Sequence, residues 1–251
     1  MSLIEHLDEL RRRIIISVVA IAVGTIGCFI FKGPLLRLLI APLSDMEMRL
    51  ITLSPTESFM TVFKVAIYGG LIVASPVIIY QIWAFVAPGL KKRERRITLT
   101  AASFTTLLFF AGVAFAWFLV LPRGLEFLLN YESGIFDQQV QASRYFSFVA
   151  MFLFAFGLVF ELPAMIVTLS WVGIVNARTL STKRKYAILL GAVISASLTP
   201  ADVFSMVALF MPFLLLYEIS LVLVRLIERS RRRKQSEADI DSGQDVGQTA
   251  G

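Results

Sequence analysis

Long apolar stretches alternate with short polar segments along most of the chain. The pattern predicts membrane-spanning helices over approximately residues 14–31, 60–84, 97–121 and 145–172. Each is close to or above the roughly 20 apolar residues that a helix needs to cross the hydrocarbon core of a bilayer. Within these four ranges the only charged residues are Lys64 and Glu161.

A fifth apolar stretch lies between Lys185 and Arg225 and contains a Thr-Pro-Ala-Asp turn that ends at Asp202. The stretch is longer than one crossing needs, but too short for two full crossings and a loop. It therefore predicts two short helices in a tight hairpin, over about residues 186–198 and 203–224. Asp202 stands where its carboxylate can cap the second helix. The first of the two would span only about 20 Å, so the bilayer beside it must thin or water must enter.

The distribution of basic residues sets the predicted topology. The chain is 57% hydrophobic and carries a net charge of +6, which by itself is also typical of nucleic-acid binding. However, 18 of its 24 Lys and Arg fall in the segments predicted to lie inside, and only five in the outer segments. This is the positive-inside pattern of membrane proteins. We expect an all-α polytopic protein with six transmembrane helices, both termini in the cytoplasm and no nucleic-acid partner.

The two ends of the chain differ in character from the apolar centre. The start, SLIEHLDELRRR, is predicted to form a short amphipathic helix at the inner surface. The first apolar helix is too long for a secretory signal, and no A-x-A pattern follows it, so we interpret it as a retained helix. Residues 1–225 are predicted to form one transmembrane domain. Residues 226–251 are polar and lack aromatics, which predicts a disordered cytoplasmic tail.

Glu161 is the most unusual single residue, because a carboxylate near the middle of a membrane helix costs at least about 2.5–3.5 kcal/mol. Pro163 follows closely and is expected to kink the helix. A kinked helix with a carboxyl at this depth favours a polar concavity with a function. The structural alternative is a protonated Glu161 that is hydrogen-bonded to a neighbouring helix.

Two further acidic positions lie among cations. Glu94 stands in the loop segment KKRERR, where a local ion pair with its neighbours is the simplest interpretation. Near the amino terminus, Glu9 is spaced to pair with Arg13, and Asp8 with Arg12, as i,i+4 partners. A binding role for these carboxylates requires a cationic ligand that displaces the local partners, as a guanidinium fork does.

The residues needed for several chemistries are missing from the sequence. There is a single cysteine, Cys28, and a single histidine, His6, so the chain has neither a thiolate cluster nor a two-histidine zinc motif. It also contains no nucleotide-binding Gly-rich motif followed by Lys. We predict that the protein is not an enzyme and binds neither a metal nor a cofactor.

Four motifs together resemble the TatC family, the six-helix receptor subunit of the twin-arginine protein translocase. They are HLDELRRR, SPVIIYQIWAFVAPGLKKRERR, FGLVFELP and LTPADVFS, and the similarity runs from about His6 to Arg225. The resemblance implies a cupped arrangement of helices in the prokaryotic cytoplasmic (inner) membrane. It also implies binding of Arg-Arg signal peptides of folded proteins, whose export the proton-motive force drives.

The resemblance assigns roles to several positions. In that family an acidic residue of the first inner loop contacts the arginine pair, and here it corresponds to Glu94, with Phe85 nearby. The amino-terminal motif contributes Glu9, followed by Arg11. Glu161 corresponds to the buried carboxylate that faces the hollow of the cup.

Other matched positions have structural or partner-related roles, namely Pro42, Pro163, Asp202 and Met206. The Met206 position lies where the family meets its single-span partners, TatA and TatB. Some relatives have a polar residue there, and a methionine can pack flexibly against a partner helix.

Two other functions remain as alternatives. A proton- or ion-coupled secondary transporter would use Glu161 as its relay, although no internal repeat is evident in the sequence. A purely structural scaffold would tolerate the loss of both Glu94 and Glu161.

Overall fold

The computed structural model describes residues 3–44, 50–86, 95–130, 139–171, 173–199 and 202–248. These ranges are almost entirely helical. The helices are α1 (Leu3–Ile30), α2 (Lys32–Ser44), α3 (Glu57–Val86), α4 (Arg95–Phe115), the π-helix η3 (Ala116–Val120), α5 (Leu121–Asn130), α6 (Ala142–Phe160), α7 (Leu162–Trp171), α8 (Ala177–Thr182), α9 (Arg184–Leu198) and α10 (Val203–Gln248). Two short strands complete them, β1 (Leu50–Ile51) and β2 (Val140–Gln141).

Five stretches of the described helices are long and apolar enough to cross a membrane. They are Glu5–Ile30, Glu57–Phe85, Ala101–Leu129, Ala142–Trp171 and Val203–Ser230. The remaining predicted crossing is α9, whose 15 residues extend about 22 Å at 1.5 Å per residue. The all-α polytopic fold class is confirmed, and α9 is short, as the position of the turn at Asp202 predicts. The prediction that the second hairpin helix is also short was wrong, because the apolar span Val203–Ser230 of α10 has 28 residues.

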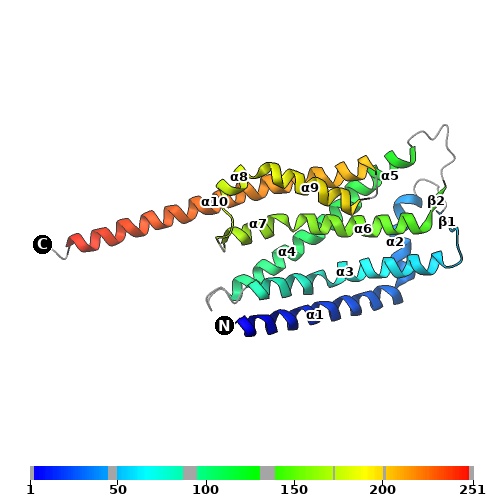
Figure 1. Ribbon diagram of the computed structural model, residues 1–251, viewed down its shortest axis with the longest axis horizontal. Helices are drawn as coiled ribbons and strands as arrows, with labels where there is room; N and C mark the ends of the chain where they lie inside the picture. Colours follow the sequence, from blue (N-terminus) through cyan, green and yellow to red (C-terminus); the bar gives the residue numbers. More distant parts are fainter. Residues whose placement is uncertain are drawn as a thin grey trace.

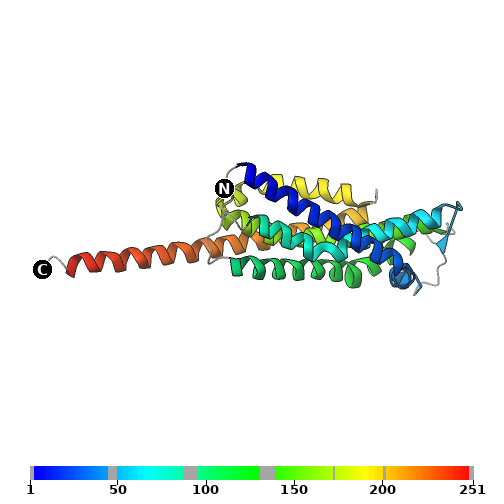
Figure 2. The ribbon, with the colours of Figure 1, turned by 90° about the horizontal axis from the view of Figure 1, so that it is seen from below.

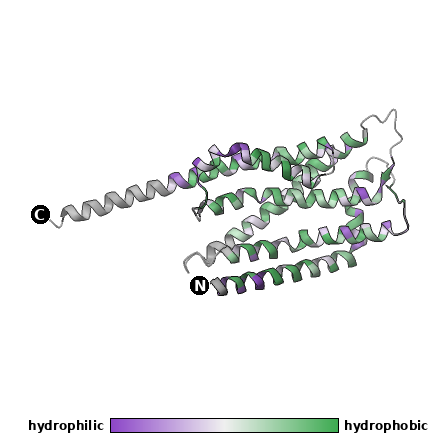
Figure 3. Cartoon of the chain, in the orientation of Figure 1, coloured by the Kyte–Doolittle hydropathy of each residue, from purple (hydrophilic) through white to green (hydrophobic). Residues whose placement is uncertain are grey.

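The long helices run side by side, with α1 against α3 at one edge and α9 with α10 at the other (Figures 1 and 2). The span that contains α6 and α7 lies at the centre of the bundle. In its most apolar window 56% of the residues are buried inside the protein, whereas none is buried in the corresponding window of α1. Apolar residues cover most of the bundle, and polar ones gather at the start of α1 and around α8 (Figure 3). The side of α1 that faces away from α3 is therefore available to lipid.

The two strands close one end of the bundle, which we call the strand end. Leu50 pairs with Val140 and Ile51 with Gln141 in a parallel arrangement. Beside them Glu57, 8% exposed, accepts backbone N–H groups from Leu53 at 2.7 Å and from Ser143 at 3.1 Å. This carboxylate joins the start of α3 to the start of α6.

Helices α1 and α3 approach each other backbone to backbone. A Cβ atom added at Gly24 would lie 2.8 Å from the carbonyl oxygen of Gly70, and one at Gly70 would lie 2.5 Å from the backbone nitrogen of Thr25. Such spacing is too close for a side chain, so the two glycines allow the tight contact.

Two predicted boundaries were wrong. The amino-terminal amphipathic segment continues into the first crossing as the single helix α1. After it, α2 passes through Pro42, which removes only one N–H near the end of that helix. The third crossing does not end near Leu121. It continues through the wide π turn into α5, whose second residue is Pro122.

The tail also differs from the expected disorder, because α10 is helical as far as Gln248. Between Arg225 and Gly243 the sequence contains no glycine or proline and is rich in Arg, Lys, Glu and Gln, which favour helices. Figure 1 shows this part of α10 extending beyond the bundle. The division into a domain of residues 1–225 and a tail of residues 226–251 stays a prediction.

Candidate functional site

The ends of α1 and α3 opposite the strand end meet in a cluster that we call the α1–α3 rim. It consists of His6, Glu9, Arg13, Gln81 and Phe85. The rings of His6 and Phe85 stack with their centroids 4.5 Å apart and their planes 20° apart. This contact holds the first turns of α1 against the last turns of α3. Two candidates from the sequence, Glu9 and Phe85, therefore lie in the same cluster.

Within the α1–α3 rim, Glu9 is held by an arginine of its own helix. Arg13 Nε donates to Glu9 Oε1 at 3.1 Å, and a second guanidinium nitrogen of Arg13 pairs with the same oxygen. Arg13 Nη1 also donates to Gln81 Oε1 at 3.1 Å, which links the ion pair to α3. The predicted i,i+4 pair of Glu9 and Arg13 is confirmed, and Gln81 extends it across the helix interface.

The second oxygen of Glu9 has a different environment. Glu9 Oε2 is buried and has no hydrogen-bond partner among the residues that the structure describes. A buried carboxylate oxygen without a donor costs free energy, of the order of 1–3 kcal/mol, that a cationic donor would recover. This oxygen is thus the unused acceptor of the α1–α3 rim.

The two remaining candidates for peptide binding differ in how the structure places them. Arg11 is exposed on α1, two residues from Glu9. Glu94 lies outside the described residues, between the end of α3 at Val86 and the start of α4 at Arg95. The structure therefore brings Glu9, Arg11 and Phe85 to one end of the bundle and does not place the fourth residue of the set.

Glu161 stands at the break between α6 and α7, far along the chain from the α1–α3 rim. Its backbone N–H donates to the Leu158 carbonyl at 3.1 Å, and its own carbonyl accepts from Met165 at 3.0 Å. The side chain is 8% exposed, and Oε1 has no hydrogen-bond partner within the described ranges. Pro163 is buried directly after the break. The interruption that proline predicts is confirmed, one to two residues before the proline itself.

The hairpin between α9 and α10 contains two of the other candidates. Asp202 Oδ1 accepts the backbone N–H of Ser205 at 2.6 Å, which confirms the predicted helix cap. Met206 lies in the first turn of α10, where it is partly exposed. Pro42 is partly buried in α2, at the strand end of the bundle.

Sequence reasoning missed two residues of the α1–α3 rim. His6 and Gln81 gave no pattern of their own, because they meet their partners only when α1 and α3 pack together. Glu218 of α10 is half exposed and pairs with Arg184 of α9 at 2.9 Å.

Residues 5–212 match the family described as Sec-independent protein translocase protein (TatC). The chain belongs to the TatC family. A TatC of Carboxydothermus hydrogenoformans is 42% identical over 229 residues, which cover 91% of this chain and 94% of the relative. A TatC of Aquifex aeolicus is 39% identical over 239 residues, which cover 94% of this chain and 99% of the relative.

A solved structure supports the same assignment. The crystal structure titled Twin Arginine Translocase Receptor TatC superposes with a TM-score of 0.82 at 40% identity, covering 88% of this chain and 98% of that one. The match confirms the resemblance found in the motifs, and the chain is a polytopic membrane protein of twin-arginine protein translocation. The candidate site residues of this TatC, from Glu9 to Met206, all fall within the matched residues 5–212.

Proposed function

We propose that this TatC is the receptor subunit of a twin-arginine translocase, which binds Arg-Arg signal peptides and organises the export of folded proteins. The proton-motive force drives the export. The observation that carries the proposal is the unused acceptor Glu9 Oε2 beside the His6–Phe85 stack. Family membership supports it, because a solved relative is titled a twin-arginine translocase receptor.

The chemistry of an arginine pair suits two carboxylates among cations. A guanidinium donates two parallel hydrogen bonds to a carboxylate, whereas a lysine ammonium acts as a point charge. In our proposal Glu94 and Glu9 each receive one guanidinium. The surrounding cations, Arg11 among them, repel positive charges placed elsewhere, and this repulsion adds specificity. Phe85 provides an apolar surface next to the pair.

Glu161 has a separate role in the proposal. Its low exposure and its unpartnered Oε1 support a polar site inside the bundle, at the break before Pro163. We assign it to the hollow that receives the more apolar part of the signal peptide.

Family membership and the charge distribution support the proposed partners and location. TatA- and TatB-like single-span proteins are the proposed partners. Met206 lies in the region that contacts these partners, and Pro42 and Asp202 support the structure of that region. The chain resides in the cytoplasmic membrane of a prokaryote, embedded in the lipid bilayer with both termini inside. The excess of Lys and Arg at the non-strand end supports this orientation.

The test measures binding of a signal peptide to the purified full chain. The Arg-Arg peptide is compared with its Lys-Lys version for the unchanged chain, Glu94→Ala, Glu9→Ala and the control Glu126→Ala, an exposed carboxylate of α5. We expect the first two variants to weaken Arg-Arg binding more than Lys-Lys binding, by at least about tenfold for a lost charge-assisted pair. Equal losses for both peptides would contradict the bidentate contact.

Export then separates the proposal from the alternatives. Cells without their own TatC should export a folded reporter behind an Arg-Arg signal when given this chain, and should fail with Glu94→Ala. Full export with both Glu94→Ala and Glu161→Ala would support a scaffold. Solute counterflow in liposomes that contain this chain alone would support a transporter.

A further inference from the structure

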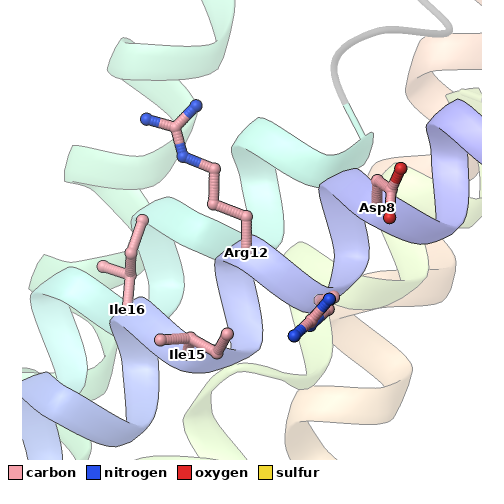
Figure 4. Close-up of a pocket in the computed structure, with 5 residues that line it drawn as sticks. Asp8, Arg12, Ile15 and Ile16 are labelled. Carbon is pink, nitrogen blue, oxygen red and sulfur yellow. The ribbon is translucent and has the colours of Figure 1, made fainter.

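A concavity of about 300 Å³ lies on α1, and all of its lining residues come from that helix. They are Asp8, Arg11, Arg12, Ile15 and Ile16 (Figure 4). The charged residues stand at one end and the two isoleucines at the other. The concavity therefore combines a polar part and an aliphatic part within two turns of helix.

The charged residues of this concavity, Asp8, Arg11 and Arg12, are exposed and form no ion pair or hydrogen bond with any residue in the described part of the chain. Asp8 and Arg12 are four residues apart, a spacing that often gives an ion pair. Figure 4 shows the Arg12 side chain extending away from the helix rather than toward Asp8. The next residue, Arg13, is by contrast fully engaged in the α1–α3 rim.

The concavity also faces a different direction from the α1–α3 rim. Successive residues of an α-helix are about 100° apart around its axis, so Asp8 and Arg12 lie about 100° from Glu9 and Arg13. Because Arg13 contacts Gln81 of α3, the concavity opens away from that interface. No residue in the most apolar window of α1 is fully buried, and Ile15 and Ile16 are both exposed, so these two side chains face the bilayer.

The position of the concavity along α1 determines which part of the lipid bilayer it contacts. Arg12 precedes Ile16 by four residues, or about 6 Å along the axis, so the charges lie just beyond the first lipid-facing residues. At this depth a membrane presents the phosphates of its lipid headgroups, with acyl chains below them. Two guanidinium groups at this level match a phosphodiester, and the isoleucines match an acyl chain.

We propose that this concavity binds one phosphatidylethanolamine molecule. Its phosphate lies between Arg11 and Arg12, its ammonium group donates to the Asp8 carboxylate, and the start of one acyl chain packs on Ile15 and Ile16. Asp8 makes the concavity selective among headgroups, because a purely anionic lipid has no cationic group to pair with the Asp8 carboxylate. A choline headgroup is also disfavoured, because its quaternary ammonium has no N–H to donate.

The experiment measures lipids retained by the purified full chain, counted by native mass spectrometry after equilibration in mixed micelles. Phosphatidylethanolamine, phosphatidylglycerol and phosphatidylcholine with identical acyl chains are compared, with inorganic phosphate as a competitor. The variants are Arg12→Gln and Asp8→Asn, and the control is Arg178→Gln, an exposed arginine of α8. Arg11 stays unchanged because it also belongs to the proposed peptide site.

We expect the unchanged chain and the control to retain phosphatidylethanolamine at least about tenfold better than the other two lipids, as one charge-assisted hydrogen bond gives. Arg12→Gln should lower the retention of all three lipids, and Asp8→Asn should abolish only the preference. No preference in the unchanged chain, or equal retention by Arg12→Gln and the control, would overturn the proposal. Displacement of the lipid by millimolar phosphate would also overturn it, because it would reveal an anion site without lipid recognition.

The outcome is independent of the proposed receptor function. The lipid assay contains no signal peptide, and Arg12→Gln should leave the ratio of Arg-Arg to Lys-Lys binding unchanged. Failure of the Glu94 and Glu9 variants to alter peptide binding would contradict the receptor proposal while leaving the lipid result intact.

Discussion

Glu57 connects two segments that lie 86 residues apart in the sequence, and its removal should loosen the strand end. The carboxylate accepts the N–H of Leu53 and the N–H of Ser143, and it is 8% exposed. Hydrogen bonds to a charged group contribute about 1.5–3 kcal/mol each. Alanine removes both acceptors. Since water near the bundle end replaces part of what is lost, we expect a local loss of about 3 kcal/mol.

The assay is amide hydrogen exchange of the full chain in detergent. A loss of about 3 kcal/mol in local opening free energy accelerates exchange by roughly 100-fold, because 1.4 kcal/mol corresponds to a factor of ten. Glu57→Ala should produce this acceleration at the amides of Leu53 and Ser143. Glu57→Gln keeps one acceptor oxygen and should give a smaller acceleration, of about tenfold. Glu126→Ala, which removes an exposed carboxylate of α5, is the control.

Equal exchange rates of both amides in Glu57→Ala and in the unchanged chain would contradict the linking role of Glu57. A uniform acceleration across α1 to α10 would also refute it, because the two bonds are confined to the strand end.

Three further predictions concern packing and helix ends. Gly70→Ala should lower the thermal unfolding midpoint by an amount equivalent to about 1–3 kcal/mol, because the new Cβ would lie 2.4 Å from a side-chain oxygen of α1. The matched change is Gly27→Ala, where the added Cβ would have nothing within 4 Å. It should leave the thermal unfolding midpoint unchanged or raise it by an amount equivalent to up to about 1 kcal/mol. Equal effects at Gly70 and Gly27 would contradict the close approach of α1 and α3. Asp202→Ala should cost about 1 kcal/mol and Asp202→Asn much less in chemical denaturation, because asparagine also caps helices, and an equal cost for both would argue against capping. A double-mutant cycle on Arg184 and Glu218 should give a coupling below about 1 kcal/mol that decreases with salt, since both side chains are about half exposed. A coupling above about 2 kcal/mol would show that the pair is shielded from solvent.

The helices that cross the bilayer were largely predictable, because hydrophobic stretches of this length have few alternatives. The hairpin at Asp202 was predicted from a proline, an acidic cap and the length of the flanking stretches, and its cap is present. The break at Glu161 followed from Pro163. In each case the cause lies within one or two turns of the residue concerned.

Features that depend on contacts between distant segments were not predictable. The parallel pairing of β1 with β2 joins residues 50–51 to residues 140–141, and neither segment has a strand pattern of its own. Likewise, His6 meets Phe85 only because α1 lies along α3. The passage of α2 through Pro42 shows that a proline near the end of a helix need not stop it.

The backbone contact of Gly24 with Gly70 limits how this TatC can move. Two helices whose backbones touch in this way cannot rotate or slide separately without a steric clash. Helices α1 and α3 therefore behave as one rigid unit. Glu9 and Phe85 lie at one end of this pair of helices, and the packing of α1 on α3 therefore fixes the distance between them. Any rearrangement of this TatC must then move α1 and α3 together as a rigid body, or occur at the opposite side of the bundle, where α9 and α10 meet.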